Sequence, residues 1–484
     1  MDLKDRLQRL TGEKIADSKI AVGNDGPPKK QSCQSEPFGT IRTGIVEDCT
    51  VRQTHRDNVL SSITMLQTGS VSRQEDIRSL RERIDAVLSR RPEGQNKEMW
   101  RYGKGHGVPL EDLISGREMT NSGGSFFCVE HVDKGYARHG RFCIRDLAPL
   151  NMNRLAVLAN EPALRRLDYR KALFLDTETT GLAGGTGTVA FLIGLGCFEE
   201  DRFVTRQLFA RDYAEEKAAL LYLHELIQDR QFLVSFNGKA FDVNLLAARF
   251  IMNRLADPLA GLPHLDLLHP ARRLLSHRLS DRRLGTLEAA LLGFEREGDV
   301  PGSEIPQRYF DWLRRRDGRL MADVFEHNRL DILSLAAIAA HFTELLDPDQ
   351  GMSHHHPGDL LAAARLFLDR DGSEEAVRFL TPLTAVSCYK TAQEAARELS
   401  LYFKRRGEWS EAVAVWQEMV RRDGGDLFAL LELAKWAEHR RRDLSQALAL
   451  TLRAGGCSDC LTPDDIAALN RRRERLERKM EKIN

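Results

Sequence analysis

Apolar and polar residues follow different patterns in four successive parts of the chain. Residues 1–75 show little periodicity and are rich in Gly, Ser, Gln, Asp, Pro and Lys, which predicts a mostly disordered segment with one short amphipathic helix at residues 3–10. Residues 76–168 predict a helix followed by a small β-rich extension. In that extension, runs 123–132 and 140–150 have the pattern of short strands around a glycine-containing turn.

Residues 169–346 contain five β-prone runs and four amphipathic helical runs. The β-prone runs are 171–178, 188–198, 202–210, 231–238 and 264–270. The helical runs are 215–228, 243–255, 284–293 and 322–342. The first three strands are joined by short connections and should pair antiparallel, whereas the later alternation of strands and helices predicts parallel additions. This part therefore predicts an α/β domain with a mixed five-stranded sheet flanked by helices.

Residues 357–484 predict an all-α region after a polar break. The sequences "DGSEEAV", "GEWSEAV" and "RDLSQAL" recur there and place Ala376, Ala412 and Ala447 at equivalent positions. The spacing is close to the ~34 residues of a tetratricopeptide unit, which predicts a short solenoid that binds a protein or peptide partner. A helical lid packed on the α/β domain is the alternative interpretation.

Acidic residues occur at three separated places in the α/β part. In "LFLDTETTGL", Asp176 and Glu178 are two apart on a predicted strand, so both carboxylates should point to one face and repel each other. Asp242 stands where a strand meets a helix, a position that would also suit a helix cap. His327 and Asp331 are four apart and share one face of a predicted helix, where an exposed pair is the ordinary interpretation.

Taken together, these oxygen ligands suit Mg²⁺ or Mn²⁺, which would supply the positive charge that the paired carboxylates need. Two such ions about 3.5–4 Å apart can hold the attacking and the leaving oxygen of a phosphodiester. His327, one helical turn from Asp331, has an ordinary pKa of about 6.5 and would suit a general base near neutral pH.

The motifs "DTETTG", "FNGKAFD" and "HNRLD" resemble, in order and spacing, the three motifs of DnaQ-like (DEDD) exonucleases, which have a ribonuclease H-like fold. The resemblance is closest to the YprB-type ribonuclease H-like branch, in which helical repeats can follow the nuclease domain. It implies four metal-binding acids and a general base at His327. The implied metal ligands are Asp176, Glu178, Asp242 and Asp331. Three residues separate His327 from Asp331, which is the spacing of the tyrosine subclass rather than of the histidine subclass.

The resemblance also implies that the backbone around Thr179 and Thr180 lies near the terminal nucleotide. Asn237 and Lys239, just before Asp242, are placed to contact a phosphate or sugar; a turn asparagine and a solvated lysine are the alternatives. Phe241 is expected in the core, with base stacking as the alternative. Several arginines are candidates for a basic groove, of which only some are expected to serve: Arg249, Arg272, Arg273, Arg282 and Arg283.

Composition limits the classes of function. The chain has 71 Lys and Arg against 71 Asp and Glu, so any binding of nucleic acid must come from a local patch. The charged start "MDLKDRLQRL" lacks a signal-peptide pattern, and no apolar run is long enough to span a membrane. Eight thinly spread cysteines then predict a cytoplasmic protein with reduced thiols.

The leading hypothesis is a divalent-metal-dependent 3′–5′ exonuclease that hydrolyses the terminal phosphodiester bonds of single-stranded nucleic acid, with RNA and DNA both open. Two alternatives belong to other classes. One is a catalytically inactive ribonuclease H-like protein that binds nucleic acid, and the other is an interaction scaffold built on the helical repeats.

Overall fold

The computed structural model describes residues 107–484 except 182–186, 351–353, 371, 457–460 and 483–484. The disordered segment, amphipathic helix and second helix predicted before residue 107 lie outside the described residues. Within them, no helix combines the length and apolar character needed to cross a bilayer.

One mixed sheet organises the α/β part, with strand order β1-β2-β7-β6-β5-β8-β9. Its strands are β1 Gly116–Asn121, β2 Gly124–Asp133, β5 Ala172–Thr179, β6 Ala190–Glu199, β7 Arg202–Phe209, β8 Phe232–Ser235 and β9 His264–Asp266. As predicted, β5, β6 and β7 pair antiparallel, and β8 and β9 extend the sheet in parallel from β5. A two-residue pair, β3 Arg138–His139 and β4 Phe142–Cys143, stands apart.

Two predictions about the sheet were wrong. The sheet has seven strands rather than five, because β2 pairs antiparallel with β7 and brings β1 with it, so the β-rich extension continues the main sheet. Run 140–150 is not a strand: beyond β4 it forms a 3₁₀ turn at Ile144–Leu147. Ile144 and Leu147 are buried in the core by that turn, which explains an apolar pattern that resembled a strand.

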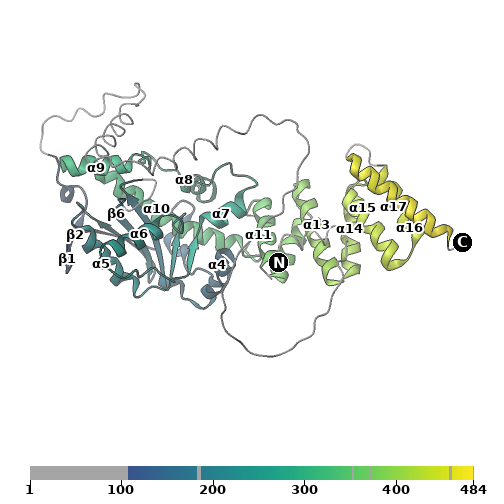
Figure 1. The fold of residues 1–484 in the computed structure, drawn as a ribbon, viewed down its shortest axis with the longest axis horizontal. Helices are drawn as coiled ribbons and strands as arrows, with labels where there is room; N and C mark the ends of the chain where they lie inside the picture. The colour runs from purple at the N-terminus through teal and green to yellow at the C-terminus, as the bar shows by residue number, and fades with distance from the viewer. Residues whose placement is uncertain (1–106, 182–186, 351–353, 371, 457–460, 483–484) are drawn as a thin grey trace, which may run out of the picture. The chain divides into compact units, whose positions relative to one another are not determined.

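Helices cover both faces of the sheet (Figure 1). They are α4 Met152–Ala159, α5 Glu216–Ile227, α6 Asp242–Met252, α7 Leu268–Leu275, α8 Leu284–Leu287 with a π-turn at Glu288–Leu292, α9 Ile305–Arg315 and α10 Arg319–Leu345. Leu173 and Leu175 of β5 point into the core formed with α5 and α6. Ala172 and Phe174 point to the opposite face, into the core that α10 shares. Because side chains alternate between the two faces of a strand, the following residues of β5 point in turn toward α10 and toward α6.

Helix α10 approaches β6 closely because glycines face it. An added Cβ on Gly194 would lie 2.3 Å from the Asn328 Oδ1 atom, and one on Gly196 would lie 2.5 Å from the Ile332 Cγ2 atom. Both distances are shorter than a van der Waals contact, so α10 can pack this close to β6 only where the facing residues of the strand are glycines. Gly194 pairs with Asp176 across the β5–β6 ladder, which places the first predicted acid beneath α10.

The described residues from 357 onward form a series of helices, as predicted (Figure 1). The helices are α11 Pro357–Asp369, α12 Ser373–Leu383, α13 Tyr389–Arg406, α14 Trp409–Arg422, α15 Leu427–Trp436 with a π-turn at Ala437–Arg441, α16 Leu444–Gly455 and α17 Pro463–Glu481. Ala376, Ala412 and Ala447 are each the fourth residue of α12, α14 and α16 and are completely buried. These contacts fit a repeating helix pair; the tetratricopeptide assignment and its partner stay predictions.

Candidate metal and nuclease centre

Strand β5 ends in the predicted pair of acids. Asp176 and Glu178 have the same parity as Ala172 and Phe174, so both side chains point to the α10 face. The Asn328 Nδ2 atom of α10 donates a hydrogen bond of 2.9 Å to the Asp176 Oδ2 atom. The strand thus delivers two carboxylates to the underside of one helix, as the spacing of the two acids predicts.

Helix α10 brings His327 and Asp331 to the same place. One ligand atom from each of Glu178, His327 and Asp331 lies within 4.8 Å of the others. The His327 Nε2 atom is 3.5 Å from Asp331 Oδ2 and 3.9 Å from Glu178 Oε1. All three side chains are 12–14% exposed, so the group is nearly closed yet can still be reached from solvent.

Asp242 reaches the centre from the other side of the sheet. Thr177, between the two acids, points to the opposite face from them, where α6 begins with Asp242. The Thr177 Oγ1 atom donates a hydrogen bond of 2.5 Å to Asp242 Oδ1. Two helix layers therefore supply acids to the last residues of one strand. The structure brings all five predicted catalytic residues to this strand end.

The carboxyl groups of the centre are buried and lie close enough to repel one another when ionised. Burial raises the pKa of Asp176 well above its ordinary range, and the charges of Asp331, Glu178 and Asp242 raise it further. Burial likewise raises the pKa of Glu178 to about 8, against the lowering effect of His327. In the part of the chain that the structure describes, no Lys or Arg forms an ion pair with Asp176, Glu178 or Asp242.

This donor set fits a hard divalent cation. The site offers several carboxylate oxygens and one imidazole, and most of the negative charge lacks a protein cation; hard oxygen donors of this kind suit Mg²⁺ or Mn²⁺. One protein cation offsets part of this negative charge, because the Arg296 guanidinium forms an ion pair with Asp331. Arg296 also pairs with Glu288 at 2.5 Å and Asp299 at 3.1 Å.

Asp299 orients the predicted base. Its Oδ1 atom is 2.7 Å from the His327 Nδ1 atom, so the Nε2 atom is the ring nitrogen that faces Glu178 and Asp331. Burial alone would lower the His327 pKa, but the charges of Asp331 and Glu178 and the hydrogen bond to Asp299 raise it above the ordinary value. Sequence reasoning missed Arg296 and Asp299, since both lie in an aperiodic segment after α8. The motif "HNRLD" contained Asn328, whose bond to Asp176 only the packing of α10 reveals.

The predicted substrate residues lie at the end of β5 and in the loops next to the centre. Thr179 Oγ1 donates to the Gly181 carbonyl at 2.9 Å, and Thr180 Oγ1 accepts from the Val189 amide at 3.0 Å, so both hydroxyls hold the segment after β5. Asn237 has a left-handed backbone with φ of 65°, as a turn asparagine would. Lys239 is exposed beside it.

Two subsidiary predictions were wrong. Phe241 is 51% exposed rather than in the core, because it directly precedes α6 at the loop surface. Arg249 cannot line a groove, because it is buried and its guanidinium donates to both oxygens of Glu216 at 2.5 and 2.6 Å. A partner on α5, 33 residues away in sequence, could not be inferred from the local pattern.

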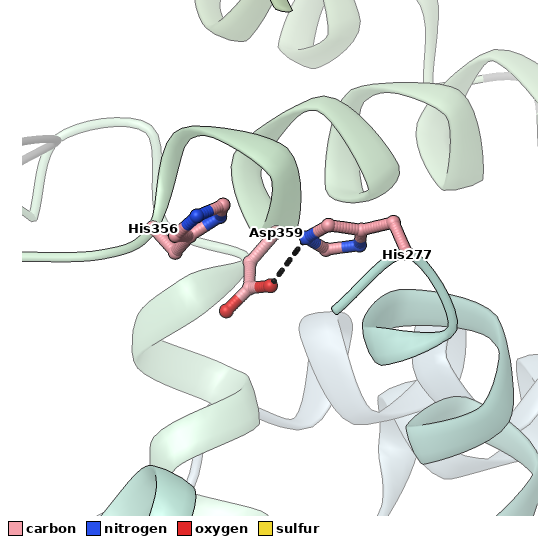
Figure 2. A group of neighbouring side chains, drawn as sticks. All are labelled: His277, His356 and Asp359. Carbon is pink, nitrogen blue, oxygen red and sulfur yellow. Dashed lines mark ion pairs between the residues drawn. The ribbon is translucent and has the colours of Figure 1, made fainter. Parts of the chain in front are cut away.

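A second cluster of potential ligands lies where α7 meets α11. Figure 2 shows His277, His356 and Asp359 near one another, with His277 Nε2 at 3.2 Å from Asp359 Oδ1. Both Asp359 oxygens already accept from the Arg278 guanidinium, at 2.8–3.2 Å. A metal ion there would face that positive charge, so we interpret the cluster as a structural joint between the two helices.

Replacing Asp359 by Ala should destabilise the protein by roughly 2–4 kcal/mol, because it leaves Arg278 largely buried without its partner. Thermal unfolding measures the change. Asp349→Ala is the matched control, since Asp349 pairs with Arg378 on an exposed surface and its loss should lower the stability far less. Equal losses for the two variants would contradict the structural role given to Asp359.

A single methyl group at residue 194 should disturb the centre. In Gly194→Ala the new Cβ would collide with Asn328, displacing its bond to Asp176 and costing about 1–3 kcal/mol of stability. We expect divalent-metal affinity, measured by calorimetry, to fall severalfold. Gly187→Ala is the control because nothing lies within 4 Å of its added Cβ, and that variant should bind metal as the wild type does. An unaltered affinity in Gly194→Ala would show that Asn328 is dispensable.

The sheet order and the strand-end acids define a ribonuclease H-like domain, and residues 173–343 match the RNase_H superfamily. Proteins of this superfamily are generally nucleases that use divalent metals. Over 349 residues the chain is 31% identical to the uncharacterized protein YprB of Bacillus subtilis (strain 168), an alignment that covers 71% of this chain and 83% of that protein. The chain therefore belongs to the same family as YprB. The DnaQ-like subtype stays a prediction.

Proposed function

We propose that the protein is a metal-dependent 3′–5′ exonuclease that acts on single-stranded nucleic acid. The observation that carries this proposal is the meeting of Asp176, Glu178, Asp242, His327 and Asp331 at the end of β5 from both faces of the sheet. A binding protein without activity would have no need of repelling carboxylates whose pKa values are raised by their own packing.

The four acids would hold two Mg²⁺ or Mn²⁺ ions, which when bound would offset the carboxylate charge and polarise the phosphodiester. The His327 Nε2 atom is oriented to take a proton from the attacking water, and Asp299 at Nδ1 holds the ring in the tautomer that leaves Nε2 free to accept. The water oxygen would bond to phosphorus as the bond from phosphorus to the 3′ oxygen of the preceding nucleotide breaks.

Thr179 and Thr180 would position the terminal nucleotide through the backbone that their hydroxyls fix. Asn237 and Lys239 would contact the adjoining phosphate or sugar. Lys239 supports this role best, because its side chain is exposed and forms no ion pair with any residue that the structure describes. The location in the cytoplasm belongs to the same proposal and rests on the sequence alone.

The direct test uses single-stranded RNA and DNA oligonucleotides labelled at one end, with Mg²⁺ or Mn²⁺. A 3′ label should appear as mononucleotide from the outset, and a 5′ label should appear as a ladder of shortened strands. Absence of products from both polymers, or equal products from the wild type and Asp176→Asn, would overturn the proposal.

A further inference from the structure

We propose that a cavity between α4, α7 and the end of α11 binds the phosphodiester backbone of the substrate strand upstream of its 3′ end. This inference rests on the proposed function and deepens it, because it names the part of a polymeric substrate that the protein holds. It also makes the C-terminal helical region part of the substrate site.

The cavity has a volume of about 380 Å³, and its lining combines four cationic side chains with the apolar residues Leu158, Ala159, Pro270 and Leu366. Arg272 and Arg273 come from α7, Lys239 from the loop before α6, and Arg370 from the end of α11; His269 adds a further nitrogen. The only acid in the lining is Asp266. Its oxygens accept backbone amides of Asn237, Lys239 and Leu268 at 2.7–3.1 Å, and among the described residues they form no ion pair with a lysine or arginine of the lining.

The positive charges in this cavity are incompletely paired. Among the residues that the structure describes, Lys239 and Arg272 have no side-chain ion pair or hydrogen bond, and both are exposed. Arg370 is half-buried and donates to the neutral carbonyl of Val157. Burial lowers the Arg370 pKa and the charge of the neighbouring Arg273 lowers it further, whereas Asp369 raises it. Arg273 has an anionic partner, Asp369. An anion bound here would relieve this repulsion and form charge-assisted hydrogen bonds.

The cavity adjoins the nuclease centre through one loop. Residues 237–239 bond to Asp266 on the cavity side. On the other side, a Cβ added to Gly238 would lie 3.3 Å from the Asp242 Oδ2 atom. If the 3′ end of a nucleic-acid strand lies at Asp242, the strand can run past the loop of residues 237–239 and place a phosphate upstream of the 3′ end in the cavity. This closeness favours a polymer backbone over a separate small anion.

The wall supplied by the helical region is held firmly. Arg278 pairs with both oxygens of the buried Asp359, and His277 contacts the same carboxylate (Figure 2). Arg273 pairs with Asp369 one residue before Arg370. These contacts fix α11 against α7 and hence keep Arg370 facing the cavity. The site is consequently pre-formed, which lowers the entropic cost of ordering it around a substrate.

Fluorescence anisotropy with labelled single-stranded oligonucleotides tests the proposal on the full chain, in an Asp176→Asn background that prevents hydrolysis. Arg272→Gln should weaken binding roughly 3–10-fold, and its slope of log affinity against log salt should fall by about 0.7, the value for one lost single-strand phosphate contact. Among the residues that the structure describes, Arg272 has no side-chain hydrogen bond or ion pair to lose, so weaker binding by the variant would not arise from unfolding. Arg370→Gln should act in the same direction.

Arg471→Gln on α17 is the matched control, because Arg471 is equally exposed and lies outside the cavity. Affinity and salt slope unchanged in Arg272→Gln and Arg370→Gln would overturn the inference. So would equal competition for the cavity by inorganic phosphate and by the oligonucleotide, since that result would indicate a free anion.

Hydrolysis separates this inference from the proposed function. With Asp176 intact, Arg272→Gln should raise KM for a long strand and leave dinucleotide hydrolysis unchanged. If the wild type hydrolyses both substrates but Arg272→Gln matches it on both, the cavity role fails and the exonuclease stands. If the wild type hydrolyses neither, yet Arg272→Gln weakens oligonucleotide binding, the exonuclease fails and the cavity role stands.

Discussion

Asp176→Asn should abolish nuclease activity and at the same time stabilise the metal-free protein. The Asp176 carboxyl is buried beside Asp331, Glu178 and Asp242, and both the burial and the repulsion raise its pKa. A neutral amide of the same shape removes this repulsion, so the melting temperature should rise by a few degrees, on the scale of about 2–4 °C per kcal/mol. Activity should fall by roughly a thousandfold or more, because a metal ligand next to the reaction is lost.

The pH dependence of this effect has a definite sign. A carboxyl whose folded pKa is raised ionises first in the unfolded chain, so its ionisation destabilises the fold progressively as pH rises from about 4 toward the folded pKa. For Glu178 that window ends at about 8. Without metal, the stability gain of Asp176→Asn should therefore be absent near pH 4 and grow as the pH rises toward the raised pKa of Asp176.

Excess Mg²⁺ should reverse the order of stability, because the wild type binds the ion more tightly than the variant. Asp201→Asn is the matched control, since Asp201 lies on the exposed turn between β6 and β7 and should affect neither stability nor activity. A metal-free Asp176→Asn protein that melts below the wild type at pH 8 would refute the electrostatic account.

His327→Ala should lower kcat by roughly 10²–10⁴-fold, the usual contribution of a positioned general base. Loss of the imidazole should change oligonucleotide affinity little, because the proposed partner of the imidazole is the attacking water and not the nucleic acid. Kinetic measurement of kcat and of KM separates these effects. A kcat of His327→Ala close to the wild-type kcat would show that His327 is not the general base.

Asp299→Asn tests the same assignment through pH. The hydrogen bond and charge of Asp299 raise the His327 pKa, so their loss should lower it and move the acidic limb of the pH–rate profile to lower pH. The rate at the plateau should also fall, because an amide does not hold the ring tautomer as a carboxylate does. A variant with an unmoved limb and a lower plateau would indicate that Asp299 supports only the local structure.

Local patterns predicted the parts of the fold that depend on local periodicity. The apolar pattern of residues 322–342 correctly predicted the central part of α10. The spacing of Asp176 and Glu178 correctly predicted that both acids lie on one face of β5. Short connections gave the antiparallel pairing of the first three predicted strands. In each case the information lies within a few consecutive residues, where helix and strand periods act directly.

The features that sequence reasoning missed depend on distant contacts. β2 pairs with β7, whose partner residues lie 70 to 82 positions later in the chain, and nothing in the sequence of β2 specifies that neighbour. Arg296 and Asp299 lie in an aperiodic segment that becomes part of the centre only when α10 packs across it. Arg249 was a candidate for a basic groove until Glu216 on another helix accounted for its charge.

The register of β5 has one further consequence. Residues 172–175 are apolar on both faces, so a slip of one position would still bury hydrophobic side chains on each side. The same slip would swing Asp176 and Glu178 toward α6 and offer Thr177 to α10 in their place. Such a chain would look folded by its compactness and helix content while having no reaction centre, so refolded preparations need to be judged by bound metal rather than by circular dichroism alone.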